Sequence, residues 1–411
     1  MTNKNTFIKN FSKLFSGAFL SQLISFIISP VLSRLFTAED FGVFALYIQI
    51  LSPLLVLGGA GLYLLLPQNK NESSSNTIFQ ISMILSLILS FVIMLVGVFG
   101  AEPVMNFNIL WPYLAIGILL TNIRGFFHFQ SISDQFFLYN SKSKLVESLG
   151  GSSTNIATGY MGYTQLGLVF GNIVGQFLFI FSFLWKYKTK LNNLLKRQKV
   201  QVYNAFIREH KKHIVLQSTN QIIEFVFILS FSILITKSSS ISNLGYFAFC
   251  YKIINTPLML FADYFGSLAL ARVSDSVETK DQRTFILKSA LLLFVPSVIL
   301  IFIFRNFGVG IFSFVFGSDW SQAGAIARVY ILGITSVFFI KSLQHIPTVK
   351  SKHEVYTFFS FLAFGLPVLV LLYGQQYDLD FISSLEKLSY MLFALACFYF
   401  MTLLRLFSNK D

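Results

Sequence analysis

Charged side chains inside long apolar stretches are the residues of this sequence that could do chemistry. A charge within a membrane-spanning helix costs about 2.5 to 3.5 kcal/mol on insertion scales, so each such residue is a candidate for function. Basic members outnumber acidic ones, and the excess is compatible with an anionic substrate group, because Arg and Lys hold phosphate by charge-assisted hydrogen bonds. The basic residues are Arg34, Arg124, Lys252, Lys288, Arg328 and Lys341, and the acidic ones are Glu147, Glu224 and Asp263.

Helical spacing places several polar residues on one face of a single apolar segment. Lys252, Asn255 and Asp263 share this face, together with Thr256 and Met259. An internal repeat matches this segment to an earlier one, in which Gln49 and Ser52 are placed opposite Lys252 and Asn255. Two facing polar stripes predict a cavity. The predicted substrate-binding residues are Lys252, Arg34, Arg328, Gln49, Ser52 and Asn255, and the predicted ion-coupling residues are Glu224 and Asp263.

Structural interpretations of the same residues stand beside the functional ones. Ser, Thr, Asn and Gln commonly hydrogen-bond between packed membrane helices, which would make the polar stripes structural. Lys252 would also be structural if it formed a buried ion pair with Glu224 or Asp263. Arg34 lies near the outer end of its segment, where an interfacial anchor is as reasonable as a ligand.

Three further basic residues lie close to the predicted cytoplasmic ends of their segments. A long side chain in such a place can extend its charged head to the interface while its stem stays in the apolar region. For Arg124, Lys288 and Lys341 this snorkelling is the favoured interpretation, and none of them belongs to the predicted site.

An enzyme would need a nucleophile with a base or a set of metal ligands, and the sequence offers neither. None of the five histidines is paired with such residues. Asp378 and Asp380 have the D-x-D spacing of some glycosyltransferases, but an external loop favours ordinary solvation for them. We predict no enzymatic activity, no cofactor and no metal, and we expect Cys250 and Cys397 to be buried and inert.

The composition places these residues in a bilayer. The 411 residues are 55% hydrophobic and 12% charged, and soluble proteins carry about twice that charge fraction. Hydropathy predicts an all-α polytopic membrane protein with about 12 transmembrane helices. The segments are 14–35, 41–66, 77–100, 108–127, 144–163, 165–185, 214–236, 244–270, 285–304, 322–344, 355–374 and 386–405, of which 144–163 and 214–236 are weak because they are rich in polar residues.

The distribution of Lys and Arg predicts the orientation. With both termini in the cytoplasm, most of the 31 Lys and Arg residues fall in cytoplasmic loops, and the opposite loops hold only Lys237 and Arg305. The net charge of +13 is therefore explained by topology, and we expect no nucleic-acid partner. The first segment lacks a cleavage site of small residues, so we expect a retained span and not a signal peptide.

An internal repeat divides the chain. A shift of 203 residues lays "TAEDFGVFALYIQI" on "SISNLGYFAFCYKI", with helix-capping residues at the start of both stretches: Thr37 with Asp40, and Ser240 with Asn243. Six spans return the chain to the same side, so the halves are predicted to be parallel repeats with a site between two six-helix lobes. The predicted domains are an N-terminal lobe 1–190, a basic cytoplasmic linker 191–213 and a C-terminal lobe 214–411.

The stretch from Phe15 to Gln68 resembles the N-terminal signature of polysaccharide biosynthesis proteins of the O-antigen flippase (Wzx-like) type. The resemblance is carried by the runs Ser33-Arg34-Leu35-Phe36 and Glu39-Asp40-Phe41-Gly42, by Leu66-Pro67, and later by "NLGYFAFCYKIINTPLMLF" and "FGSDWSQAG". These proteins are a branch of the multidrug/oligosaccharidyl-lipid/polysaccharide (MOP) exporter superfamily. The resemblance implies a MATE-like arrangement of two six-helix lobes around a central cavity.

The resemblance implies a flippase that moves an undecaprenyl-pyrophosphate-linked oligosaccharide, an O-antigen or capsule repeat unit, to the outer leaflet of the bacterial inner membrane. Alternating access between the lobes is the mechanism we expect. Its partners would be the lipid-linked oligosaccharide, membrane lipids, and a polysaccharide polymerase with assembly proteins of lipopolysaccharide production. The alternative is a cation-coupled multidrug antiporter of the same fold, whose site should be acidic and aromatic.

Overall fold

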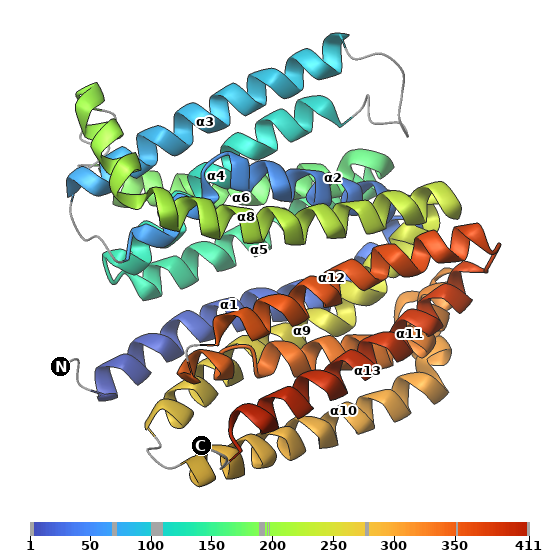
Figure 1. Ribbon diagram of the computed structural model, residues 1–411. Coiled ribbons are helices and arrows are strands. Elements are labelled where there is room, and N and C mark those ends of the chain that lie inside the picture. Colours follow the sequence, from blue (N-terminus) through green and yellow to red (C-terminus); the bar gives the residue numbers. More distant parts are fainter. Residues whose placement is uncertain are drawn as a thin grey trace. The chain divides into compact units, whose positions relative to one another are not determined.

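The computed structural model describes residues 4–67, 72–99, 110–188, 194, 196, 198–275, 279–350 and 352–408. Within these ranges the chain is helical, without strands, and forms twelve helices of 20 residues or more (Figure 1). Each predicted segment falls on one of them. They are α1 (Lys4–Leu35), α2 (Ala38–Leu57), α3 (Glu72–Phe99), α4 (Trp111–Ser133), α5 (Phe137–Tyr160), α6 (Thr164–Lys186), α8 (Val200–Ser238), α9 (Ile241–Asp275), α10 (Thr279–Phe316), α11 (Ser321–Ser342), α12 (His353–Gln376) and α13 (Phe381–Leu406).

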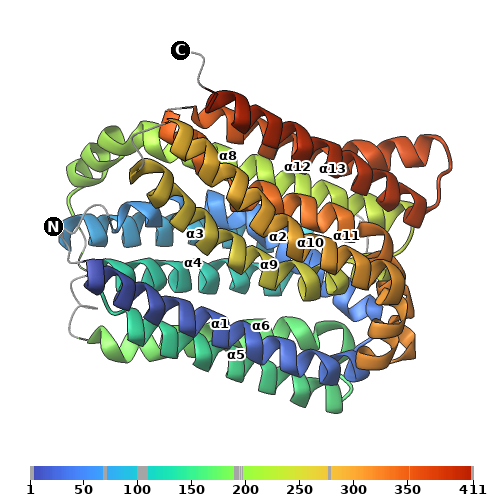
Figure 2. The same ribbon diagram turned by 90° about the horizontal axis from the view of Figure 1, so that it is seen from below.

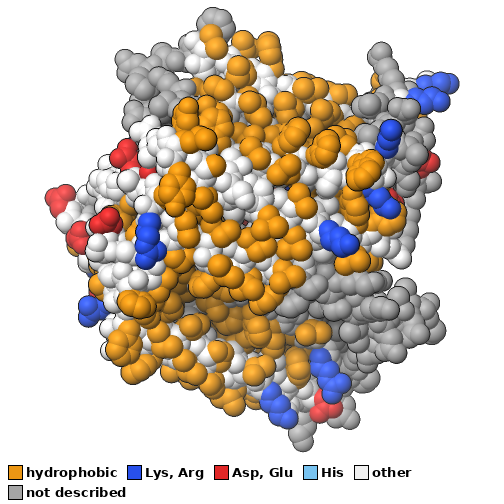
Figure 3. All heavy atoms as spheres, turned by 180° about the vertical axis from the view of Figure 1, so that it is seen from behind, with side chains coloured by type: hydrophobic (Ala, Val, Ile, Leu, Met, Phe, Trp, Pro, Cys, Tyr) orange, Lys and Arg blue, Asp and Glu red, His pale blue; other side chains and the backbone are white. Residues whose placement is uncertain are grey.

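Nine of the described helices are long and apolar enough to cross a membrane on composition alone, which confirms a multi-pass membrane protein. The helices α1, α4 and α5 fall short of that measure. Large apolar side chains cover much of the outer surface, and charged side chains are sparse on the face shown in Figure 3. A surface of this kind is suited to lipid and not to water.

Two predicted boundaries differ from the structure. Segment 41–66 is not one helix, because α2 ends at Leu57 and the chain turns through Gly59, whose φ of 102° is accessible to glycine, into the short 3₁₀ helix η1 (Ala60–Leu65). Helix α8 begins at Val200, so the second half of the predicted linker 191–213 is helical.

The chain forms two compact units. The N-terminal unit comprises Met1–Phe36 and Val43–Leu229, and the C-terminal unit comprises Thr37–Gly42 and Ser230–Asp411. The division falls inside α8 and not in the basic linker, and the first turn of α2 belongs to the C-terminal unit. The division lies 16 residues beyond His213, where the predicted linker ends.

Glycines hold α5 against its neighbours in the N-terminal unit, where α1, α5 and α6 run side by side (Figure 2). A β-carbon on Gly151 would lie 2.8 Å from the backbone oxygen of Gly171, and one on Gly175 would lie 2.8 Å from that of Glu147. Small residues let membrane helices approach closely enough to pack by van der Waals contact. This packing explains how α5, a polar segment by hydropathy, is accommodated.

Aromatic rings fill the core where α9, α10 and α11 meet in the C-terminal unit. Trp320 is buried, and its ring centroid lies 4.1 Å from that of Phe249 and 5.2 Å from that of Phe41. Gly317 directly precedes the short 3₁₀ helix Ser318–Trp320, and its φ of 108° is a conformation that favours glycine. The stretch "FGSDWSQAG" is therefore a packing motif.

The predicted repeat is borne out by a reciprocal contact. A β-carbon on Gly42 would lie 2.1 Å from the backbone oxygen of Ile241, and a β-carbon on Gly245 would lie 1.7 Å from that of Ala38. Under the shift of 203 residues, Gly42 corresponds to Gly245 and Ala38 to Ile241. Gly42 of the first half thus meets Ile241 of the second half, and Gly245 of the second half meets Ala38 of the first. Equivalent residues make the same contact in both directions, which is the pattern that a two-fold axis produces.

The predicted helix caps are also confirmed. The Thr37 backbone N–H donates to Asp40 Oδ2 at 2.8 Å, and the Asp40 backbone N–H donates to Thr37 Oγ1 at 3.3 Å. At the matching position, the Asn243 backbone N–H donates to Ser240 Oγ at 3.0 Å. Both caps begin the helices that cross at the paired glycines.

We predict that Gly245→Val destabilises the protein by about 3 kcal/mol or more, because the added side chain would meet a backbone oxygen that cannot move aside. Thermal unfolding of the purified protein in detergent measures this. Gly310→Ala in α10 is the control, because a β-carbon there meets no described atom within 4 Å. Equal melting temperatures for the two variants would contradict the close crossing.

Candidate functional site

Lys252 lies within α9 and its side chain is exposed. Among the described residues of the C-terminal unit, no carboxylate lies within ion-pair distance of it, so the proposed pair with Asp263 does not form. One turn further on, Asn255 is buried, and its side-chain oxygen accepts no hydrogen bond from any described group. An exposed cation and an unsatisfied acceptor thus lie within one turn of the same helix.

On α2, the two predicted residues behave differently. The side-chain oxygen of Gln49 is buried and accepts no hydrogen bond from a described group, like that of Asn255. Ser52 Oγ donates to the backbone oxygen of Ile48 at 2.7 Å, so its hydroxyl proton is used within its own helix. Of this pair, only Gln49 offers an unused polar atom.

The two predicted arginines are both exposed. Arg34 Nη1 donates to the backbone oxygen of Pro30 at 2.6 Å, at the last turn of α1, which favours a structural role at the helix end. Arg328 lies in the first half of α11 with its side chain exposed. The structure brings neither of them into a described contact with Lys252.

The predicted ion-coupling residues lie in different units. Glu224 is half-buried on α8 in the N-terminal unit. Asp263 is exposed on α9 and interacts electrostatically with Lys341 and His345 of the same unit. The ammonium of Lys341 also lies 5.9 Å from the ring centroid of Tyr356, so this lysine belongs to a mixed polar and aromatic cluster.

Sequence reasoning missed the strongest ion pair among the described residues. Arg124 on α4 binds Glu147 on α5 with two hydrogen bonds, Nε to Oε1 at 2.5 Å and Nη2 to Oε2 at 2.9 Å. The Arg124 side chain is 28% exposed and that of Glu147 is 19% exposed. The snorkelling interpretation of Arg124 is therefore wrong, because its guanidinium is held by a neighbouring helix.

Helix α6 also contacts α4 beside the ion pair. The guanidinium carbon of Arg124 lies 5.1 Å from the ring centroid of Phe179 on α6. One turn earlier on α4, Thr121 Oγ1 donates to Gln176 Oε1 at 2.7 Å, and Gln176 Nε2 donates to Asn172 Oδ1 at 2.7 Å. Polar contacts thus join α4 to α5 through Glu147 and α4 to α6 through Gln176.

Lys144 and His128 lie next to the ion pair. Lys144 is half-buried, one turn before Glu147 on α5, and interacts electrostatically with Arg124 and Glu147. His128 interacts with Lys144 and Arg124, and its Nδ1 lies 2.9 Å from Asn140 Nδ2. The fully buried Asn140 also donates to the His128 backbone oxygen at 3.0 Å. Two cations therefore surround one carboxylate.

At the cytoplasmic end predicted for α6, Tyr187 donates to Asp134 Oδ2 at 2.7 Å. Burial, together with this hydrogen bond to the Asp134 carboxylate, raises the pKa of the Tyr187 phenol. The phenol therefore stays protonated and ties α6 to the end of α4.

The D-x-D spacing has a structural explanation. Asp380 Oδ2 accepts a hydrogen bond from the Ile382 backbone N–H at 3.2 Å and caps the start of α13. Among the described residues, no group of three or more His, Cys, Asp and Glu side chains could hold a metal ion.

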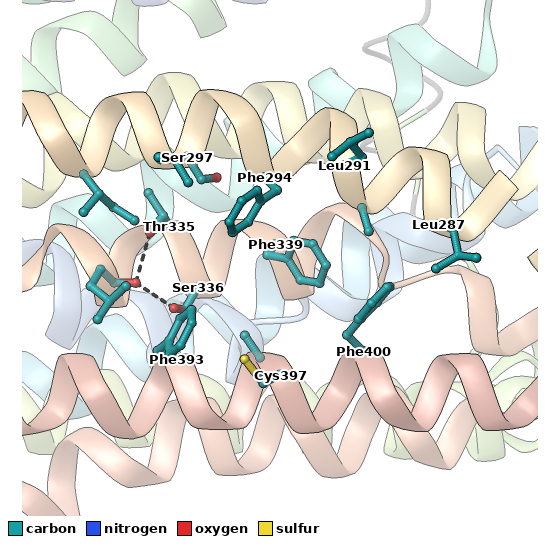
Figure 4. Close-up of a pocket in the computed structure, with 15 residues that line it drawn as sticks. Leu287, Leu291, Phe294, Ser297, Thr335, Ser336, Phe339, Phe393, Cys397 and Phe400 are labelled. Atoms are coloured by element: carbon teal, nitrogen blue, oxygen red, sulfur yellow. Dashed lines mark hydrogen bonds between the residues drawn. The ribbon is translucent and has the colours of Figure 1, made fainter. Parts of the chain in front are cut away.

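An apolar cavity of about 370 Å³ lies between α10, α11 and α13 in the C-terminal unit (Figure 4). Its three hydroxyl groups donate to carbonyls of their own helices: Ser297 to Leu293 at 2.8 Å, and Thr335 and Ser336 to Leu332 at 3.1 and 2.6 Å. These hydroxyl protons are therefore used within their own helices, and the other lining residues are hydrophobic.

The two cysteines differ, which corrects one prediction. Cys250 is buried as expected, but Cys397 is exposed and lines the apolar cavity. The sequence could not separate them, because both lie in apolar helices and only the packing of α13 decides which face is covered.

We predict that Arg124→Gln destabilises the protein by at least about 1 kcal/mol, since it leaves the Glu147 carboxylate without its partner. The double variant Arg124→Gln/Glu147→Gln should regain most of this loss, because two neutral amides can hydrogen-bond. Thermal unfolding of the four proteins in a double-mutant cycle measures the coupling. Additive effects would contradict the ion pair.

We also predict that the cavity at Cys397 faces lipid. A bimane label on Cys397 in the Cys250→Ser variant should be strongly quenched by brominated phosphatidylcholine in nanodiscs. The control label sits at position 318 through Ser318→Cys, in a variant that lacks both native cysteines, and should be quenched much less. Equal quenching at both positions would show that Cys397 does not face the acyl chains.

Comparison with known proteins was made on sequence and on fold. A profile of the family described as polysaccharide biosynthesis protein matches residues 31–325. No curated protein sequence matches the chain.

Several solved structures share the fold. The lipid II flippase MurJ in an inward closed conformation has a TM-score of 0.71 at 14% identity, over 95% of this chain and 87% of that one. An inward-facing multidrug resistance MATE family transporter of the MOP superfamily has a TM-score of 0.63 at 12% identity, over 95% and 96%. A MOP superfamily transporter from Pyrococcus furiosus has a TM-score of 0.57 at 13% identity, over 98% and 95%.

The predicted fold class is thus confirmed as a helical membrane protein with the fold of MATE and MurJ transporters. The family profile covers more than half of the chain and includes the matched glycines, caps and aromatic motif described above. The chain therefore belongs to the polysaccharide biosynthesis protein family and has the fold of MOP superfamily transporters.

Proposed function

We propose that the protein is a flippase that moves an undecaprenyl-pyrophosphate-linked oligosaccharide, an O-antigen or capsule repeat unit, from the cytoplasmic to the outer leaflet. The observation that carries this proposal is Lys252. A lysine in the interior of a membrane helix must face protein or water, because lipid does not accommodate its charge. Lys252 is exposed and has no carboxylate partner among the described residues of its unit, so an anionic group of the substrate is its natural counter-ion.

The unsatisfied amides support the carbohydrate part of the proposal. Gln49 and Asn255 each present a buried side-chain oxygen with no described donor. A buried acceptor without a hydrogen bond costs about 1 to 3 kcal/mol, which a ligand hydroxyl can recover. Sugar rings carry many hydroxyl donors, so these two positions suit a glycan.

Alternating access is the mechanism we propose. The substrate headgroup would enter from the cytoplasm, Lys252 with Arg34 and Arg328 would attract its phosphates, and the two units would then open outward. Glu224 or Asp263 would take up a coupling cation between states. Prolines inside α1, α9, α10 and α12 provide positions where these helices can bend.

The proposal places the protein in the bacterial cytoplasmic (inner) membrane with both termini in the cytoplasm. There it would act without catalysis, with a polysaccharide polymerase and assembly proteins of lipopolysaccharide or capsule production as partners. The family description supports the polysaccharide context, and the fold shared with a lipid II flippase supports the transport of a lipid-linked substrate.

A cation-coupled multidrug antiporter is the second candidate. It is favoured by the exposed carboxylate of Asp263 and by the fold shared with multidrug resistance MATE transporters. The excess of basic residues within the helices opposes it, because an organic cation needs negative counter-charge.

We predict that deletion of the gene leaves the lipid-linked oligosaccharide on the cytoplasmic leaflet and removes the surface polysaccharide. Lys252→Ala should fail to restore surface polysaccharide although the protein is still inserted at normal levels. Arg305→Ala should restore it, because Arg305 is exposed and paired with Glu386 and Tyr390 instead. Immunoblots of membranes and of surface polysaccharide measure both effects.

Two outcomes would contradict this proposal. Full surface polysaccharide in the deletion strain would reject the flippase, and increased sensitivity of that strain to cationic drugs would support the antiporter. Full restoration by Lys252→Ala would reject the role given to Lys252.

A further inference from the structure

The ion pair of the N-terminal unit carries more positive than negative charge. Arg124 and Lys144 are the two cations and Glu147 is the carboxylate that both of them interact with. Among the described residues, Lys144 forms no ion pair closer than 4.0 Å, so one positive charge of this cluster is not neutralised at contact distance.

The cluster lies away from the ends of its helices and is still partly exposed. Arg124 is near the middle of α4 and Glu147 is near the middle of α5, away from the ends where a side chain could reach the interface. Their side chains are 28% and 19% exposed. Acyl chains do not accommodate such charges, so we expect the exposed side of the pair to face water or a polar ligand.

The geometry of Arg124 suits more than one anion. A guanidinium binds carboxylate and phosphate with the same planar pair of N–H donors. Phe179 and Glu147 hold this fork in a fixed orientation, and Lys144 lies one turn away on the helix that supplies Glu147.

We propose that Arg124 and Lys144 form a binding site for a pyrophosphate group, and that Glu147 occupies the Arg124 fork when the site is empty. The inference rests on the proposed flippase function and adds a second phosphate site, in the N-terminal unit, to the one at Lys252. The entering phosphate takes over the hydrogen bonds of Arg124, and Glu147 turns away.

The resident carboxylate has a physical reason. Without it, two cations would face each other in a region of low dielectric, and the empty protein would be destabilised. An anion that replaces Glu147 exchanges one ion pair for another and gains the contact with Lys144. Glu147 thus competes with the ligand, and its removal should strengthen binding.

Because Glu147 competes with the ligand, its removal should raise the affinity for pyrophosphate, whereas general structural damage would lower it. The full chain is placed in phosphatidylcholine nanodiscs, and inorganic pyrophosphate is titrated by calorimetry. Lys144→Gln and Arg124→Gln/Glu147→Gln should each weaken binding by about tenfold or more, while Glu147→Gln should strengthen it several-fold. Glu386→Gln is the matched control, since it removes the carboxylate of the exposed pair with Arg305 and should change nothing.

Three results would overturn the inference. They are wild-type protein that binds no pyrophosphate, weaker binding by Glu147→Gln, and unchanged binding by both Lys144→Gln and the double variant. Addition of phosphatidylglycerol to the nanodiscs separates a lipid headgroup from the proposed ligand: unchanged affinity supports pyrophosphate, and loss of pyrophosphate binding assigns the site to headgroups.

The proposed function and this inference can fail separately. If the deletion strain loses surface polysaccharide but Lys144→Gln restores it fully, the flippase stands and the second phosphate site is rejected. If the deletion strain keeps its surface polysaccharide, the flippase itself is rejected, whatever pyrophosphate does in nanodiscs.

Discussion

Hydrocarbon cannot satisfy a backbone polar group or a charge, and this constraint determines most of what the molecule looks like. Every described segment that crosses the apolar region is a helix, because a helix pairs its own N–H and C=O groups. Within the helices, hydroxyls donate to carbonyls of the previous turn, as Ser52 and Ser336 do. Arg124 is paired with Glu147, and Lys252 is exposed.

The same constraint explains why packing rests on small residues. Apolar surface gains little by moving from lipid to protein, so helices associate through close van der Waals contact and hydrogen bonds. Glycines bring α5 against α6 and bring α2 against α9, with backbone oxygens where β-carbons would otherwise be. Aromatic rings around Trp320 then fill the wider spaces. The polar helix α5 is tolerated because its small residues are covered by neighbours.

Hydropathy and periodicity were sufficient to predict the twelve helices, the helix caps at Thr37 and Ser240, and the repeat that pairs Gly42 with Gly245. These features are local or depend on a regular period. The Arg124–Glu147 pair could not be predicted, because it joins two helices whose rotation about their axes is set by packing that the sequence does not display. The break after Leu57 was missed for another reason: the residues that follow Gly59 are as apolar as the helix before it.

The reciprocal contact of Gly42 and Gly245 also bears on how such a chain could arise. If a six-helix ancestor had formed a symmetric dimer, the ancestor of Gly42 and Gly245 would have been one position. The glycine of each copy would then have packed against the equivalent helix of the other copy. After duplication and fusion, the two copies became separate positions that mutate independently. The rest of each half was then free to diverge toward different chemistry, such as an ion pair in one and an exposed lysine in the other. The two glycines at the crossing were not free to change, because a side chain added at either position would push the two helices apart.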